Sequence, residues 1–240
     1  MQGHEDYVTV VSFSSDGNHI VSGSQDGIIY IWDASCGTAV QGPLRGHDDC
    51  VSCLQFTSDG KQIISGSWDR TIRAWDVSSG MECYGPLQGH QSLISSIALS
   101  QDGKWIVSGS SDKTVRAWNM NLGVEAYPPL LVEHSPSVDF SSDGTQILAY
   151  SNKYVYVWDA LKGTCISKVK QTEFRRYKQP VAISTSGWVK DFQTDKIICK
   201  LPELVTRYSI SNLVTSKKAM ALSFDNGQLL IIQFPVLTEG

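Results

Sequence analysis

The side chains best suited to chemistry occur as one set that recurs along the chain. Its first copy consists of His4, Ser24, Asp26 and Trp32, with Ser22, on the same strand face, as the alternative to Ser24. Serine, histidine and aspartate form the triad of many hydrolases, in which the serine attacks, the histidine moves the proton and the aspartate orients the histidine. The set therefore raises the question of a hydrolytic enzyme.

Repetition of the set favours a structural role. The other copies are His47, Ser67, Asp69 and Trp75, and then His90, Ser110, Asp112 and Trp118. In every copy the histidine precedes the tryptophan by 28 residues, and successive histidines are 43 residues apart. A nucleophile needs one prepared site, not one per repeat. No phosphate-binding loop, nucleophile elbow or HExxH motif is found either. We therefore expect a protein that is not an enzyme and takes no cofactor.

Short motifs mark the same three units. Each begins with Gly-His, continues through Asp-Gly and Ser-Gly-Ser, and ends with Trp-Asp or Trp-Asn. These motifs resemble the WD40 repeat family. Within that family, their sequences are most similar to the WD40 arrays of fungal NACHT-type (STAND) signalling proteins. The resemblance implies a β-propeller with a hydrogen-bonded tetrad of His, Ser, Asp and Trp inside each blade. Such a chain can satisfy all its members, because tryptophan only donates while serine and neutral histidine do both.

The residues themselves indicate an all-β fold. In the first unit, residues 8–13, 20–24 and 28–32 are rich in β-branched and aromatic side chains, and a fourth strand is expected at 39–44. Asp-Gly supplies the positive φ angles that a tight hairpin needs. We predict a β-propeller of about six four-stranded antiparallel blades, the last one incomplete, with part of a seven-bladed ring as the alternative.

A single domain is expected over residues 1–240. Its well-matched repeats are 3–45, 46–88 and 89–132, and its degenerate repeats are 133–170, 171–202 and 203–240. The fourth repeat keeps His134, Ser151 and Trp158, but Asn152 or Lys153 stands where the aspartate should be. Its network should therefore be weaker. The last two repeats are expected to form strands at 180–184, 187–193, 197–201, 207–211, 219–224 and 229–234.

Closure of the ring poses a problem. The pattern yields six sets of three strands but only five outer strands. Only residues 1–3 precede His4, which is too few for an ordinary strand of about 5 residues. We therefore expect the chain to be a fragment of a longer protein. The open apolar edge at residues 229–234 should then favour self-association.

Composition and charge limit the classes of protein to which the chain can belong. The chain is 41% hydrophobic and 18% charged, with a net charge of -4, which excludes intrinsic disorder. Its apolar runs are too short to span a bilayer. Residues 1–6 lack the pattern of a signal peptide, so we expect residence in the cytoplasm, with the nucleus as the alternative. Cys50 and Cys53 have CxxC spacing without further zinc ligands nearby, so no metal site is expected.

The resemblance also implies where partners bind, namely on the face formed by the loop after Gly-His and by the turn that carries the tetrad aspartate. This face would display Glu5, Asp6, Gln25, Asp48, Asp49, Trp68, Gln91, Ser92 and Ser111. Trp68 is either an exposed anchor for a partner or packs on Arg70 or a neighbouring loop. The leading hypothesis is a scaffold or sensor that binds a protein or peptide, a basic one in view of these acids.

Two other functions stay open. The segment 168–178 carries five Lys or Arg residues and would bind nucleic acid or phosphoinositides with a steep salt dependence. The negative net charge and the lack of a recognised RNA motif favour a protein partner instead. A substrate adaptor for ubiquitin ligation is the second alternative, and it also acts through protein binding.

Overall fold

The computed structural model of the chain describes residues 3–141, 143–170, 181–183, 188–191, 197–200, 210–215, 219–224 and 229–233. These residues form strands, turns and loops, and the strands assemble into six antiparallel sheets. No helix long and apolar enough to cross a membrane occurs among them. The predicted all-β class and its six strand sets are thereby confirmed.

The first two sheets contain four strands each, in chain order. They comprise β1 (Val8–Phe13), β2 (His19–Ser24), β3 (Ile29–Asp33) and β4 (Ala39–Leu44), then β5 (Val51–Phe56), β6 (Gln62–Ser67), β7 (Ile72–Asp76) and β8 (Glu82–Leu87). The cross-strand registers agree: Ser22 faces Tyr30, and Ser65 faces Arg73. The two sheets therefore share one geometry, as their sequence repeat predicts.

The third and fourth sheets vary this plan. The third has β9 (Ile94–Leu99), β10 (Trp105–Ser110), β11 (Thr114–Asn119), β12 (Val124–Glu125) and β13 (Leu130–Leu131). Both short strands pair with β11, so the outer strand is in two pieces. The fourth has β14 (Ser137–Phe140), β15 (Gln146–Tyr150), β16 (Tyr154–Asp159) and β17 (Cys165–Lys170).

The last two sheets have three strands each among the described residues. They are β18 (Val181–Ile183), β19 (Trp188–Asp191) and β20 (Ile197–Lys200), then β21 (Ile210–Thr215), β22 (Ala219–Phe224) and β23 (Leu229–Gln233). The strand predicted at 207–211 was misplaced, because β21 begins at Ile210 and pairs along β22 as far as Thr215. An outer strand of the fifth set would lie in residues 201–209, outside the described part of the chain. Self-association at the edge of β23 stays a prediction.

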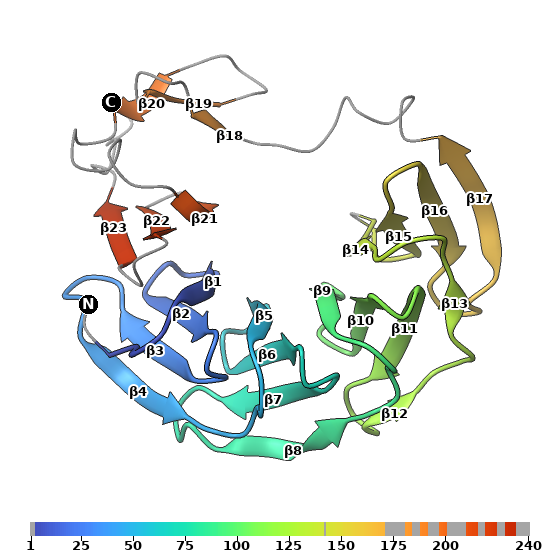
Figure 1. Cartoon of the computed structure of the whole chain (residues 1–240), viewed down its shortest axis with the longest axis horizontal. Helices are drawn as coiled ribbons and strands as arrows, with labels where there is room; N and C mark the ends of the chain where they lie inside the picture. The colour runs from blue at the N-terminus through green and yellow to red at the C-terminus, as the bar shows by residue number, and fades with distance from the viewer. Residues whose placement is uncertain are drawn as a thin grey trace.

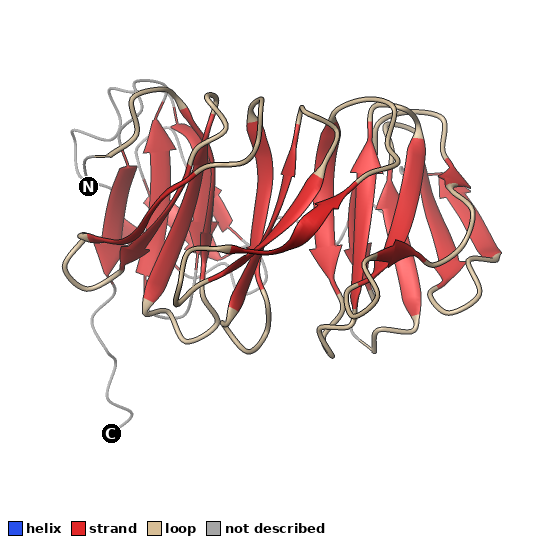
Figure 2. Ribbon diagram, turned by 90° about the horizontal axis from the view of Figure 1, so that it is seen from below, coloured by secondary structure: helices blue, strands red, loops and turns tan. Residues whose placement is uncertain are grey.

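The sheets follow one another around a curve. The first strands β1, β5, β9 and β14 each contact the next, and Figure 1 shows them on the inner side of the curve, with β4, β8 and β17 outside. Strands β21 and β22 contact β1, so the last sheet lies beside the first. Seen from the side, the turns and loops gather at two opposite edges (Figure 2).

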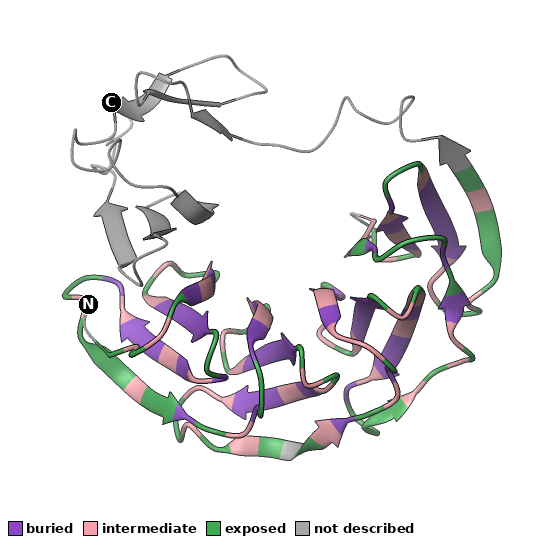
Figure 3. Ribbon diagram, in the orientation of Figure 1, coloured by how far each residue is buried: buried purple, intermediate pink, exposed green. Residues whose placement is uncertain are grey.

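The hydrophobic core lies between neighbouring sheets. Val21 and Ile31 of the first sheet, for example, form one buried cluster with Val51 and Leu54 of the second. The buried positions accordingly concentrate on the inner three strands, whereas β4 is largely exposed (Figure 3). Full burial of a Val, Leu or Ile side chain stabilises a fold by about 1.5–3 kcal/mol. The sheets therefore hold one another in place.

The glycine of Ser-Gly-Ser permits this close approach. A Cβ added at Gly23 would lie 2.6 Å from Val51 Cγ1, and one at Gly66 would lie 2.8 Å from Ile94 Cγ2. At Gly109 the same atom would lie 2.6 Å from the backbone oxygen of Pro136. In each case the contacted atom belongs to the next repeat. The glycine is therefore required by packing between blades and not by its backbone angles.

Serine hydroxyls on the inner strands β5 and β9 also link neighbouring sheets. Ser52 Oγ donates to the carbonyls of Gly66, at 3.1 Å, and of Ile94, at 2.5 Å. Ser95 Oγ similarly contacts the carbonyls of Gly109 and Pro136, at 3.1 and 3.0 Å. One hydroxyl thus bridges its own blade and the next. Both bridging serines lie at bulges, Ser52 between Val51 and Cys53 and Ser95 between Ile94 and Ser96.

We predict that Gly66→Ala lowers the free energy of unfolding by about 1–3 kcal/mol, because its Cβ would overpack Ile94 and the Cys53 sulfur. Gly85→Ala is the matched control, since no atom lies within 4 Å of a Cβ at Gly85. It should change stability by less than about 0.5 kcal/mol. Urea denaturation of both variants measures the difference, and equal losses would contradict the packing role of Gly66.

Candidate functional site: the buried tetrads and the rim they support

A continuous chain of hydrogen bonds runs through the interior of the second blade. Trp75 Nε1 donates to Ser65 Oγ at 2.9 Å, and Ser65 Oγ lies 2.6 Å from His47 Nε2. His47 Nδ1 lies 2.8 Å from Asp69 Oδ2. His47, Ser65 and Trp75 are buried, and Asp69 is half-buried at the edge of the sheet. The four side chains thus connect the middle of the blade to its edge.

The chemistry of the partners fixes the direction of each bond. Ser65 Oγ accepts from Trp75, so its own hydrogen points to His47 Nε2, and the histidine donates from Nδ1 to Asp69. Thr71 Oγ1 also donates to Asp69, at 2.7 Å from Oδ1. Burial acts to raise the pKa of Asp69, but the hydrogen bonds from His47 and Thr71 outweigh it and hold the pKa below its ordinary value. Asp69 therefore stays ionised as the acceptor that ends the chain.

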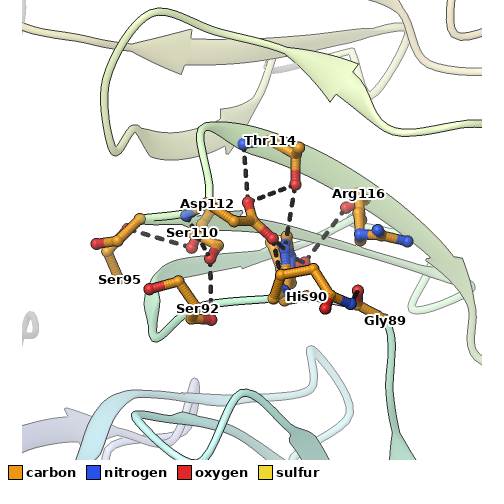
Figure 4. Close-up of polar contacts among 12 residues, drawn as sticks. Gly89, His90, Ser92, Ser95, Ser110, Asp112, Thr114 and Arg116 are labelled. Carbon is orange, nitrogen blue, oxygen red and sulfur yellow. Dashed lines mark hydrogen bonds and ion pairs between the residues drawn. The ribbon is translucent and has the colours of Figure 1, made fainter.

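The third blade repeats this geometry. His90 lies 2.9 Å from Asp112 Oδ2 and 2.8 Å from Ser108 Oγ, which accepts from Trp118 Nε1 at 2.9 Å. Thr114 Oγ1 donates to Asp112 Oδ1 at 2.6 Å, as Figure 4 shows. Burial lowers the pKa of His90, against the opposing effect of Asp112. The imidazole is therefore neutral at neutral pH.

The tetrad serine is the first of Ser-Gly-Ser and not the second. The prediction of Ser24, Ser67 and Ser110 is wrong, because Ser22, Ser65 and Ser108 bridge histidine and tryptophan. Residues two apart share a strand face, so the pattern alone does not separate them. The second serine lies at the strand end, where it serves the backbone. Ser67 Oγ donates to the Asp49 carbonyl at 2.9 Å and accepts from the Asp69 amide at 3.0 Å.

The glycine of Gly-His also has a packing role. A Cβ at Gly46 would lie 2.8 Å from Trp75 Cη2 and 3.1 Å from Arg73 Nη1. Arg73 is itself held by Glu82, at 2.7 Å between Nη1 and Oε2. The histidine can therefore reach into the blade only where the preceding residue has no side chain.

The first blade has an incomplete tetrad. His4 Nε2 lies 2.6 Å from Ser22 Oγ, which accepts from Trp32 Nε1 at 2.7 Å, but His4 Nδ1 is buried without a partner. Asp26, expected to be that partner, instead bonds the Ser24 hydroxyl and the Ile28 amide. Ile28 stands where the other two blades have the threonine hydroxyl. Burial lowers the pKa of His4 to about 4, with Asp26 only partly compensating.

The fourth repeat does not contain the weaker network predicted for it. His134 is exposed, and Ser151 Oγ donates within its own turn, to the Tyr154 carbonyl at 3.0 Å. The bridging position is Ala149, which faces Tyr156 just as Ser108 faces Arg116 in the third blade. Without a hydroxyl at this position, a histidine inside the blade would leave its Nε2 unsatisfied. In this repeat the histidine precedes the tryptophan by only 24 residues, instead of 28.

The tetrads are unsuited to hydrolysis. Ser65 and Ser108 are wholly buried, so neither oxygen can reach a substrate in the folded blade. Burial also raises the pKa of the Cys53 thiol to about 12, which disfavours a thiolate ligand or nucleophile. No group of three His, Cys, Asp or Glu side chains that could hold a metal ion occurs in the described part of the chain.

The tetrads instead organise one edge of the molecule. Asp69 Oδ2 accepts the Asp48 amide at 3.2 Å, and Asp112 Oδ2 accepts the Gln91 amide at 2.9 Å. These amides begin the loop that follows each buried histidine. The same loop binds the turn that carries the aspartate, because the Trp68 amide donates to the Cys50 carbonyl at 2.9 Å. Each tetrad therefore holds two adjacent loops together.

The residues predicted for partner binding lie on this edge, which we call the rim. The amides of Gln25, Trp68 and Ser111 donate to the carbonyls of Tyr7, Cys50 and Leu93, at 2.9, 2.9 and 3.0 Å. The exposed members of the predicted set are Glu5, Gln25, Asp48, Asp49, Trp68, Gln91 and Ser111, while Asp6 and Ser92 are half-buried. The structure thus brings the two predicted loops of each blade together.

Two aromatic side chains protrude from the rim. Trp68 is 46% exposed, and among the described residues it has no cation–π contact with Arg70. Tyr7 is 54% exposed and was missed by the sequence analysis. A comparison of the repeats contains the signal, because Tyr7 occupies the position of Cys50 and Leu93, immediately before the inner strand.

Comparison with known proteins agrees with this architecture. The family model described as "WD domain, G-beta repeat" matches residues 1–33, 38–76, 81–119 and 130–159, more than half of the chain. The chain therefore belongs to the WD40 repeat family, whose members generally mediate protein–protein interactions. The four matched segments end at residues 33, 76, 119 and 159, the last residues of β3, β7, β11 and β16. No curated protein matches the chain.

We predict that His47→Ala lowers the free energy of unfolding by about 1–3 kcal/mol, because the buried Ser65 hydroxyl loses its acceptor and Asp69 loses the imidazole donor. The matched control is His134→Ala, which removes an exposed histidine outside any tetrad and should cost less than about 0.5 kcal/mol. Denaturant unfolding measures both. A comparable loss in the two variants would contradict the structural role of the tetrad.

The incomplete first tetrad predicts a pH dependence. His4 has a pKa of about 4 in the folded chain against an ordinary value of 6.5, so the unfolded chain binds more protons between these values. The free energy of unfolding should therefore fall as the pH drops from 6.5 to 4, by up to about 3 kcal/mol, and be unaffected by this group above 6.5. His4→Gln should remove this part of the loss. Parallel stability curves for the two proteins over this range would contradict the prediction.

Proposed function

We propose that the protein is a non-enzymatic propeller that binds a protein or peptide partner at the rim, with Trp68 as the central anchor. The observation that carries this proposal is the exposure of Trp68 on a loop pair that a buried tetrad holds in place. Tryptophan and tyrosine dominate interface hot spots, since they bury a large area at low entropic cost. A rigid support lowers the ordering cost of binding further.

The cellular role that we propose for the protein follows from the family resemblance. We propose that the chain acts as a scaffold or sensor in the cytoplasm and, like the NACHT-type arrays that its repeats resemble, belongs to a larger signalling protein. Support for this comes from the motifs of its repeats alone. A substrate adaptor for ubiquitin ligation would use the same rim, and only the identity of the partner separates the two roles.

Anion binding by the segment 168–178 has less support. Lys168 Nζ lies 2.6 Å from Glu133 Oε1 and 4.1 Å from the centre of the Tyr154 ring, so its charge already has partners. Arg175, Arg176 and Lys178 of this segment lie outside the described part of the chain. A polypeptide partner at the rim is therefore the function that the described geometry supports best.

Selection of short random peptides on the full chain tests the proposal. We expect enriched peptides whose affinity falls about tenfold or more for Trp68→Ala, because this variant lacks the anchor. Met81→Ala is the matched control, since Met81 is 70% exposed but lies on the connection between β7 and β8, at the other edge. Failure to enrich any peptide, or equal losses for both variants, would contradict the proposal.

A further inference from the structure

Two rim carboxylates are held in the same conformation in adjacent blades. Asp6 Oδ1 accepts the Tyr7 amide at 2.7 Å, and Asp49 Oδ1 accepts the Cys50 amide at 2.7 Å. Each carboxylate thus uses one oxygen to fix its own loop. Neither takes part in an ion pair within the described residues.

The same two acids act on one buried thiol although they come from different blades. The charges of both Asp49 and Asp6 act on the Cys50 thiol, whose pKa is raised by burial first and by these charges in addition. The blades also touch here: Thr9 Oγ1 donates to the Val51 carbonyl at 2.5 Å. The junction between the first two blades therefore concentrates negative charge.

Each of these two acids has an exposed aromatic residue beside it. Tyr7 directly follows Asp6, and the Trp68 amide donates to the carbonyl of Cys50, the residue after Asp49. Glu5 and Asp48, the residues before Asp6 and Asp49, are exposed carboxylates as well. We call the set of Asp6, Tyr7, Asp49 and Trp68 the junction surface.

From these contacts we infer that the junction surface binds a basic segment of the partner protein, with one cationic side chain placed against Tyr7 and facing Asp6 and another placed against Trp68 and facing Asp49. This inference rests on the proposed function and specifies the chemistry of the partner. Arg or Lys side chains present both an apolar stem and a cation, so one side chain can cover an aromatic face and face a carboxylate.

Charge complementarity decides between this partner and others. An acidic segment would meet uncompensated carboxylates, and a purely apolar segment would desolvate them without replacing their lost hydration. The partner must contact the aromatic rings and compensate the carboxylates. A guanidinium does both best, because it stacks on aromatic rings and donates to carboxylate oxygens in a fixed planar geometry. An arginine-bearing segment is therefore the occupant that fits the junction surface.

The experiment uses the full chain and two fluorescent peptides, one of alternating arginine and glycine and one of alternating glutamate and glycine. We expect the arginine peptide to bind, the glutamate peptide not to bind, and binding to weaken as salt is added. Asp6→Asn and Asp49→Asn should each weaken binding about two- to fivefold. Asparagine keeps an acceptor for the loop amide, so both variants should fold.

The matched control is Asp102→Asn, which removes one negative charge from a hairpin turn at the opposite edge and should leave binding unchanged. Equal binding of the two peptides, no binding of the arginine peptide, or equal effects of all three substitutions would overturn the inference. The selection of random peptides separates this failure from that of the proposed function. Enriched peptides that depend on Trp68 but carry no positive charge would preserve the rim as a binding site while excluding a basic partner.

Discussion

The hydroxyl of a buried serine, shared between a tryptophan and a histidine, is the interaction on which each complete blade depends. Ser65 accepts from Trp75 and donates to His47, which leaves the second nitrogen of the imidazole free to donate to Asp69. Because all these groups are removed from water, loss of one leaves the others unsatisfied at a cost of about 1–3 kcal/mol each. The fourth blade illustrates this dependence. Ala149 stands there in place of the bridging serine, and the histidine of that repeat, His134, is not buried.

The same short motif links stability to function. In Ser-Gly-Ser, the first serine completes the tetrad, the glycine admits the inner strand of the next blade, and the second serine binds the loop after the histidine. The tetrad aspartate binds that loop as well. Buried hydrogen bonds thereby fix the loops of the rim, where Trp68 and Tyr7 are exposed. The tetrads can thus hold the loops of the rim in a fixed shape.

Much of this architecture could be predicted from local pattern. Strand β1 and strand β4 occupy the predicted residues, because alternation and turn chemistry determine where a strand can start and stop. Other features depend on information that spacing does not contain. Ser22 and Ser24 share a face, and only the depth of each in the sheet decides which one meets His4. Asp26 misses His4 where Ile28 replaces threonine, and Tyr7 emerges only when equivalent positions of the repeats are compared.

Hydrogen exchange at the first amide of the loop after each buried histidine tests most directly whether the tetrads hold the rim. The Asp48 and Gln91 amides donate to tetrad aspartates, whereas in the first blade Asp26 is directed to Ser24 and Ile28. We predict slow exchange at Asp48 and Gln91 and fast exchange at Glu5 in the unmodified protein. Equal exchange rates at the three amides would contradict it, because the loops would then be ordered independently of the tetrads.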